Sequence, residues 1–213
     1  MSTSDYRLYY ERNLPHYQPS GATLFLTYRL FGSLPATVIE RLRTESKELQ
    51  SRLCSINEPK LRATQADYYQ RYLFGLWDEA IHTDRVGPQW LVNSSIASLL
   101  WDSILSRDGK VYSLHACCIM PNHVHMVFTP LLRTSDEYYS LASIMGSLKG
   151  YTAREANALL GRKGQFWQHE SYDRAVRDEE ECMRIIAYVI ENPVKAGLVK
   201  EASEWRWTYP RLT

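Results

Sequence analysis

The sequence contains little cysteine, and none of it has a metal-binding or redox spacing. The four cysteines of the 213-residue chain are Cys54, Cys117, Cys118 and Cys182, and no two of them form a Cys-x-x-Cys pair. This pattern excludes a zinc ribbon and a thioredoxin-like redox motif. The adjacent Cys117 and Cys118 are expected to point to opposite faces of a strand and to pack as small apolar side chains.

The sequence also lacks a long apolar run and an excess of charge of one sign. No stretch is long enough to span a bilayer, and the first residues do not form a signal-peptide pattern, so we expect a soluble, cytoplasmic protein without membrane contacts. Lys and Arg total 25 and Asp and Glu total 24, which gives a formal net charge of +1. Any basic surface for a nucleic acid must therefore be local.

Two histidines are the most informative residues in the chain. His123 and His125 are separated by one residue in an apolar, strand-like run that includes Val124 and Met126. Side chains alternate along a strand, so both imidazoles are expected on one face while Val124 and Met126 bury on the other. The spacing indicates half of a divalent-metal site. The alternative is an ordinary pair of half-exposed histidines.

The apolar periodicity predicts an alternation of helices and strands. Residues 1–20, which contain Pro15 and Pro19, are expected to form an extended arm. Strands are expected at 23–30, at 111–119 and from residue 123, with the last two paired as an antiparallel hairpin. Helices are expected at 35–52, 65–81, 94–105 and 136–160, and in a last segment from about 178 that Pro193 ends.

One face of the last predicted helix carries a second candidate group. Arg184, Tyr188 and Asn192 are spaced four residues apart and share that face. A phenol can act as a covalent nucleophile, and a carboxamide oxygen is a suitable ligand for Mg²⁺ or Mn²⁺. The alternative is a tyrosine at the core edge and an asparagine at a helix end. Among the other tyrosines, Tyr151 with Glu155 offers a comparable pair.

A nucleophilic tyrosine needs help to lose its proton, because the ordinary pKa of a phenol is about 10. Arg184 is one candidate cation that could favour the phenolate. It can equally pair with Glu180 or Glu181 on the same helix.

A basic turn precedes an aromatic segment near residue 165. Gly161-Arg162-Lys163-Gly164 supplies two cations, and Gln165-Phe166-Trp167-Gln168-His169 follows it. Cations beside exposed aromatic rings suit single-stranded nucleic acid, in which phosphates meet the charges and bases stack on the rings. The alternative is a solvated loop whose Phe166 and Trp167 are anchored in the core.

Taken together, the segments Pro121-Asn122-His123-Val124-His125 and Tyr188 to Gly197 resemble those of the REP-associated tyrosine transposases. These belong with the single-tyrosine transposases of insertion sequences and the wider class of His-hydrophobic-His endonucleases. The resemblance extends from about Asn13 to Trp207. It implies an α+β fold, with a ferredoxin-like antiparallel sheet and helices packed on one side. Compared with the shorter members of that family, we expect a helical insertion at about 35–105 within a single domain, 1–213.

The resemblance also implies a set of roles for the site residues. His123 and His125 match the paired metal ligands, Asn192 matches the third ligand and Tyr188 matches the nucleophile. The enzyme would use Mg²⁺ or Mn²⁺ and would form a 5′-phosphotyrosine bond to single-stranded DNA from hairpin-forming repeats. We expect a monomer rather than a dimer. The alternatives are a nucleic-acid-binding module without activity and a metal-dependent phosphodiester hydrolase that uses water.

Six residues are candidates for contacting such DNA, because they are cationic or aromatic and lie near the motifs. They are Lys149, Arg154, Arg162, Lys163, Trp167 and Arg177. The alternative for each is a solvated charge or a core aromatic.

Overall fold

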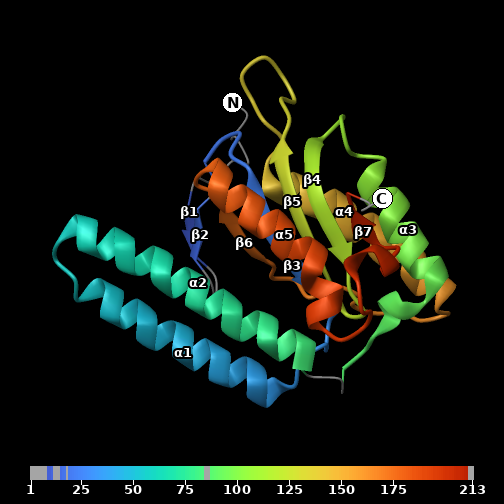
Figure 1. Ribbon diagram of the computed structural model, residues 1–213, viewed down its shortest axis with the longest axis horizontal. Coiled ribbons are helices and arrows are strands. Elements are labelled where there is room, and N and C mark those ends of the chain that lie inside the picture. The colour runs from blue at the N-terminus through green and yellow to red at the C-terminus, as the bar shows by residue number, and fades with distance from the viewer. Residues whose placement is uncertain (1–8, 12–14, 18, 84–86, 211–213) are drawn as a thin grey trace.

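The computed structural model describes residues 9–11, 15–17, 19–83 and 87–210. A five-stranded antiparallel sheet with the order β6-β3-β5-β4-β7 lies at its centre (Figure 1). The strands are β3 (Leu24–Arg29), β4 (Tyr112–Ile119), β5 (His123–Pro130), β6 (Tyr172–Ala175) and β7 (Thr208–Tyr209). A separate two-stranded sheet pairs β1 (Tyr9–Glu11) with β2 (Pro15–Tyr17).

The order of elements confirms the expected fold class. The elements of the central unit occur along the chain in the order β3, α3 (Ser94–Leu105), β4, β5, α4 (Leu141–Leu159) and β6. Their strands pair in the order β6-β3-β5-β4. This is the ferredoxin-like arrangement. Helices cover both faces of the sheet rather than one, because α5 (Glu179–Lys195) packs on β4 and β5 opposite to α4 (Figure 1).

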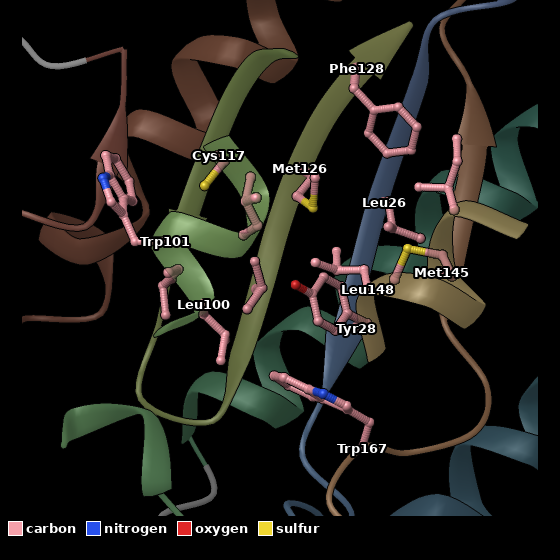
Figure 2. Close-up of a cluster of buried hydrophobic side chains, with 14 of the residues drawn as sticks. Leu26, Tyr28, Leu100, Trp101, Cys117, Met126, Phe128, Met145, Leu148 and Trp167 are labelled. Atoms are coloured by element: carbon pink, nitrogen blue, oxygen red, sulfur yellow. The ribbon is translucent and has the colours of Figure 1, made fainter. Parts of the chain in front are cut away.

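Apolar side chains lie on both faces of the central strands, which is why both faces are covered. On the face of α3 and α4, Leu26 and Tyr28 of β3 pack with Met126 of β5, Leu100 of α3 and Leu148 of α4 (Figure 2). On the other face, the buried side chains include Phe25, Val127 and Val189. The sheet is therefore the middle layer of three.

Along the chain, two long helices follow β3, before α3 and β4. α1 (Ala36–Cys54) and α2 (Pro59–Thr83) run side by side as a helical hairpin, followed by the short 3₁₀ helix η1 (Trp90–Val92) (Figure 1). Leu34, Leu42 and Ile81 share a small core of their own. Phe74 of α2 contacts the central sheet and α5: the centroid of its ring lies 5.1 Å from that of Phe25 and 5.8 Å from that of Tyr188. The hairpin is thus anchored on the face of the sheet that carries α5.

Several predicted boundaries need correction. α4 begins at Leu141 rather than near Asp136, because the Ser140 side chain caps it by accepting a hydrogen bond from the Ser143 amide. α2 begins at Pro59, six residues earlier than expected, since proline is well tolerated in a first helical turn. Pro193 does not end α5, which continues to Lys195. A proline in the last turn removes only one hydrogen bond.

The expectation for the two adjacent cysteines is confirmed. Cys117 and Cys118 are buried and belong to opposite faces of the sheet. In the described ranges, no helix has both the length and the apolarity that crossing a membrane requires. The division into a single domain with an insertion at 35–105 stays a prediction; those residues form α1, α2, η1 and α3, and α3 packs in the central core.

Candidate metal and tyrosine site

The two histidines of β5 lie on the sheet face covered by α2 and α5, and their ring nitrogens converge. His123 Nε2 lies 3.0 Å from His125 Nε2, and both side chains are buried. The other nitrogen of each ring is held by a neighbour: His123 Nδ1 donates to Asn122 Oδ1 at 2.7 Å, and His125 Nδ1 lies 2.7 Å from Thr27 Oγ1. Such partners fix the orientation of metal-binding imidazoles.

The surroundings keep both imidazoles in the form that binds metals. Burial holds the pKa of His123 well below its ordinary value and lowers the pKa of His125 to about 4. Both rings are therefore neutral near pH 7. Two nitrogens bound at right angles to one ion, each at about 2.1 Å, are about 3.0 Å apart. The spacing of His123 and His125 fits that requirement.

Helix α5 brings the predicted nucleophile and third ligand to the same place. The Tyr188 ring stands edge-on to the His125 ring, with centroids 5.6 Å apart. Asn192, one turn later, is fully buried, and its Nδ2 has no hydrogen-bond partner. The Tyr188 hydroxyl is also buried without a partner. Burial, reinforced by the nearby Asp78 carboxylate, raises the pKa of Tyr188 above its ordinary value.

Helix α2 adds two residues that the sequence patterns did not single out. Asp78 and His82, with His123 and His125, offer four ligand atoms that lie within 4.8 Å of one another. Asp78 Oδ1 lies 3.6 Å from His125 Nε2, and His82 Nε2 donates to Asn192 Oδ1 at 2.7 Å. The spacing of four residues, which places Asp78 and His82 on one helix face, is the signal the sequence offered.

Asp78 and His82 each shift the pKa of the other. Burial by itself would raise the pKa of Asp78, but the hydrogen bond from His82 and the neighbouring His125 and His82 imidazoles lower it overall. Burial would lower the pKa of His82, and the Asp78 carboxylate more than reverses this. His82 Nδ1 also lies 2.7 Å from the Asp78 carbonyl oxygen. In this conformation the His82 imidazole faces acceptors at both nitrogens, which suits its cationic form.

The cation that lies over the Tyr188 ring is Lys195 rather than Arg184. Lys195 Nζ lies 4.7 Å from the ring centroid of Tyr188. Arg184 is exposed and pairs with Glu180 one turn earlier, which is the second of the two interpretations given for it. Tyr151 lies on α4, across the sheet from the histidines, where Arg107 and Arg154 contact its ring. The fold therefore separates Tyr151 from the metal-binding face.

Two of the six DNA-contact candidates have structural roles. Trp167 is buried below Tyr28 (Figure 2), and its Nε1 donates to Thr152 Oγ1, so in this conformation it offers no free face for stacking. Lys149 Nζ donates to the carbonyls of Gln168 and His169 and to Ser171 Oγ. Burial lowers the pKa of Lys149 to about 7. Trp167 is therefore a core aromatic, as in the alternative interpretation, whereas Lys149 is neither a solvated charge nor, in this conformation, free to contact a phosphate.

The other four candidates are charged side chains at or near the surface. Arg154 pairs with Glu155, and Arg162 stacks on Trp90 with Cζ 4.0 Å from the ring centroid. Arg177 pairs with Asp67 and Glu181. Lys163 is exposed in the turn after α4. Their roles towards DNA stay predictions.

Comparisons with known proteins point in one direction. Residues 96–192 match the family described as "Transposase IS200 like". A putative REP-associated tyrosine transposase of Haemophilus influenzae is 26% identical over 102 residues, which cover 44% of this chain and 56% of that protein. The REP-associated tyrosine transposase of Escherichia coli is 25% identical over 139 residues, 64% of this chain and 78% of that protein. The chain thus spans little more than half of the first relative.

A solved structure shares the fold. The structure of a REP-associated tyrosine transposase bound to a REP hairpin superposes with a TM-score of 0.50 at 17% sequence identity. The match covers 93% of this chain and 80% of that one. Asp78 and His82 precede the residues that match the transposase family, whereas His123, His125, Tyr188 and Asn192 lie inside them.

Proposed function

We propose that this chain, whose residues 96–192 match the IS200-like transposases, cleaves and rejoins single-stranded DNA through a covalent bond to Tyr188. The observation that supports this most directly is the contact between the Tyr188 and His125 rings, on the face where the two histidine Nε2 atoms converge. A phenol beside a candidate metal site is the arrangement that a tyrosine nucleophile for phosphodiesters requires.

The proposed reaction is an in-line displacement at phosphorus. Tyr188 Oη forms a bond to phosphorus and the bond to the 3′ oxygen breaks, which leaves a free 3′-hydroxyl and a 5′-phosphotyrosine. The proton lost by the phenol balances the one gained by the 3′ oxygen. Lys195 is positioned to stabilise negative charge on the phenolate, because its Nζ lies over the Tyr188 ring. The phosphotyrosine bond keeps the energy needed for later strand transfer.

His123, His125 and Asn192 would hold a divalent cation, Mg²⁺ or Mn²⁺, which when bound polarises the phosphate. Two observations support the fit: the histidine Nε2 atoms are 3.0 Å apart, and the Asp78 Oδ1 beside them is buried without a partner. Thr27 and Asn122 orient the two rings. The tyrosine hydroxyl and both histidines are buried in this conformation, so DNA can reach them only after α2 shifts.

The proposed substrate is hairpin-forming repeat DNA with a flanking single strand. Two relatives are named REP-associated, and the structural neighbour holds a REP hairpin. Arg154, Arg162, Lys163 and Arg177 are the proposed phosphate contacts. We expect the protein to act as a monomer in the cytoplasm, because nucleophile and histidines meet within one chain and a DNA substrate is accessible there.

The test is a covalent-adduct assay. The protein is incubated with end-labelled single-stranded hairpin DNA and Mn²⁺, and the products are separated in SDS. We expect an SDS-stable adduct that Tyr188→Phe abolishes and that Tyr151→Phe, the matched control, leaves unchanged. Cleavage without an adduct would instead indicate a hydrolase that uses water, and binding without cleavage would indicate a module without activity.

A further inference from the structure

We propose that the α1–α2 hairpin supplies two further metal ligands, the Asp78 carboxylate and His82 Nε2. In this conformation the cation would be held between the sheet and the hairpin by three imidazoles and one carboxylate, and Asn192 Oδ1, which here accepts from His82, would bind it where a hairpin ligand is displaced. This proposal rests on the proposed metal site at His123 and His125 and extends it to residues outside the part of the chain that matches the transposase family.

The spacing of the four ligand atoms is close to what one ion requires. All of them lie within 4.8 Å of one another without an ion between them. Two ligands of one ion are at most about 4.2 Å apart when each bond is about 2.1 Å long. The group must therefore contract by some tenths of an ångström, which small side-chain rotations supply.

One buried oxygen of the group is unsatisfied. Asp78 Oδ1 is shielded from solvent and has no hydrogen-bond partner, although it lies 3.6 Å from His125 Nε2. Burying a carboxylate oxygen without a partner is costly. A cation between Asp78 and the histidines is a partner that removes this cost. Carboxylate oxygen is also a normal ligand for such an ion.

In this conformation a hydrogen-bonded side chain links helix α2 to the histidine strand. Asn122 Nδ2 donates to the carbonyl of Ile81 at 3.1 Å, and Asn122 Oδ1 accepts from His123. Ile81 immediately precedes His82, so one side chain joins the helix that carries His82 to the strand that carries His123. The site is thus held by side-chain contacts on both sides before any ion binds.

The ligand types identify the class of cation. Three imidazoles and a carboxylate form a nitrogen-rich set, which suits Zn²⁺, Co²⁺ or Mn²⁺ better than Mg²⁺, an ion that prefers oxygen. On binding, the cation replaces the proton that His82 Nε2 donates to Asn192 Oδ1. With four protein ligands the cation also ties α2 down over Tyr188, so a phosphate must displace a hairpin ligand or add as a fifth.

The test is a Zn²⁺ titration of the full chain by calorimetry. We expect one ion per chain, and affinity at least about tenfold weaker in both Asp78→Asn and His82→Gln, since even outer-shell partners have effects of that size. Glu79→Gln, which removes a neighbouring exposed carboxylate of α2, and His169→Gln are the matched controls and should bind as the unsubstituted protein does.

Hydrogen exchange supplies a readout that a merely structural role of Asp78 would leave unchanged. Zn²⁺ should slow exchange of the α2 amides near Asp78 and His82 in the unsubstituted protein and have no such effect in Asp78→Asn. The visible spectrum of the Co²⁺ form is a second readout, because it changes when a ligand is replaced. We expect it to differ from that of the unsubstituted protein in Asp78→Asn and in His82→Gln, and unchanged spectra would contradict the proposal.

The two proposals fail in different ways. If His125→Ala loses Zn²⁺ while Asp78→Asn and His82→Gln bind normally, the hairpin ligands are wrong and the metal site of the proposed function stands. If His123→Ala and His125→Ala also bind Zn²⁺ normally, both proposals are wrong.

Discussion

At the residue scale, Asn122 joins three parts of the site. Its side chain accepts from His123 Nδ1 and donates to the Ile81 carbonyl of α2, and its backbone carbonyl accepts from the Leu30 amide after β3. The residue is 5% exposed, so none of these groups has easy access to replacement water. The Asn122 side chain therefore fixes the orientation of the His123 ring and the distance between the histidine strand and α2.

Replacing Asn122 tests this role. Asn122→Ala removes both side-chain hydrogen bonds and should weaken divalent-metal affinity by about 10- to 100-fold, as expected for an orienting partner. Unfolding free energy should fall by about 1 to 3 kcal/mol, because the Ile81 carbonyl loses its partner. Calorimetric titration and urea unfolding measure the two effects. Unchanged metal affinity would show that the His123 ring is oriented without Asn122.

Glu181 predicts a dependence of stability on pH. Its buried carboxylate binds Arg174 and Arg177, and although burial opposes the effect, these partners lower the pKa of Glu181 to about 2 from an ordinary 4.5. A lowered folded-state pKa stabilises the fold above about pH 4.5, and this stabilisation is lost as the pH falls towards 2. Its full size is on the order of 3 kcal/mol.

The matched comparison is Glu181→Gln with Glu180→Gln. Near pH 7 Glu181→Gln should lower the unfolding free energy by about 3 kcal/mol, and its difference from the unsubstituted protein should shrink below pH 4.5. Glu180 makes an exposed pair with Arg184, so its replacement should change stability by less than about 1 kcal/mol. Urea unfolding at several pH values measures both. Equal effects at all pH values would contradict the assignment.

At the element scale, the site depends on α2, because Asp78 of this helix lies beside His125 and His82 bonds to Asn192. Two glycines offer a matched test of its packing. A Cβ at Gly75, within α2, meets nothing within 4 Å, whereas a Cβ at Gly87 would lie 2.6 Å from the Gly32 carbonyl oxygen and from Ser33 Cα. Gly87 follows the hairpin and passes directly over the turn after β3. The same substitution should therefore have opposite effects at the two positions.

Gly75→Ala should raise the unfolding free energy by up to about 1 kcal/mol, because alanine is the better helix former. Gly87→Ala should lower it by about 1 to 3 kcal/mol, since backbone atoms must move to admit the methyl group. Urea denaturation of the two variants measures the difference. Destabilisation by Gly75→Ala would mean that another part of the protein packs against α2 at this position.

Local patterns predicted the elements that carry the family-matched residues, and tertiary packing decided the rest. The alternation of side chains in β5 predicted that His123 and His125 share one face of that strand. The spacing of four predicted that Tyr188 and Asn192 share one face of α5, and the two faces meet at the site. Asp78 could not be assigned in this way, because its role depends on how Phe74 and its neighbours dock α2 on the sheet. Strand β6 has only four residues, too few for a clear periodicity.

The same limit explains the errors at single residues. Composition marked Trp167 and Lys149 as DNA contacts, yet the fold buries the ring beside Tyr28 and surrounds the ammonium with carbonyl oxygens. For Arg184, the interpretation as a partner of Glu180 is confirmed. Charge and aromaticity identify a side chain that can bind DNA, but only its packing shows whether it is free to do so.

At the scale of the whole molecule, the proposed site forms within one chain from β5, α5 and α2. This predicts that variants lacking different parts of the site cannot complement each other. A mixture of Tyr188→Phe and His125→Ala should form no more adduct with hairpin DNA than either variant alone. Restored adduct in the mixture, measured in SDS gels, would show that the nucleophile of one chain acts at the histidines of another.

The proposed function depends above all on a covalent bond between Tyr188 and DNA, and peptide mapping of the adduct tests it most directly. Protein trapped on single-stranded hairpin DNA with Mn²⁺ is digested with nuclease and trypsin, and the modified peptide is sequenced by mass spectrometry. We predict a nucleotide attached through its 5′-phosphate to Tyr188. A nucleotide on Tyr151 or on any other residue would contradict the proposed function.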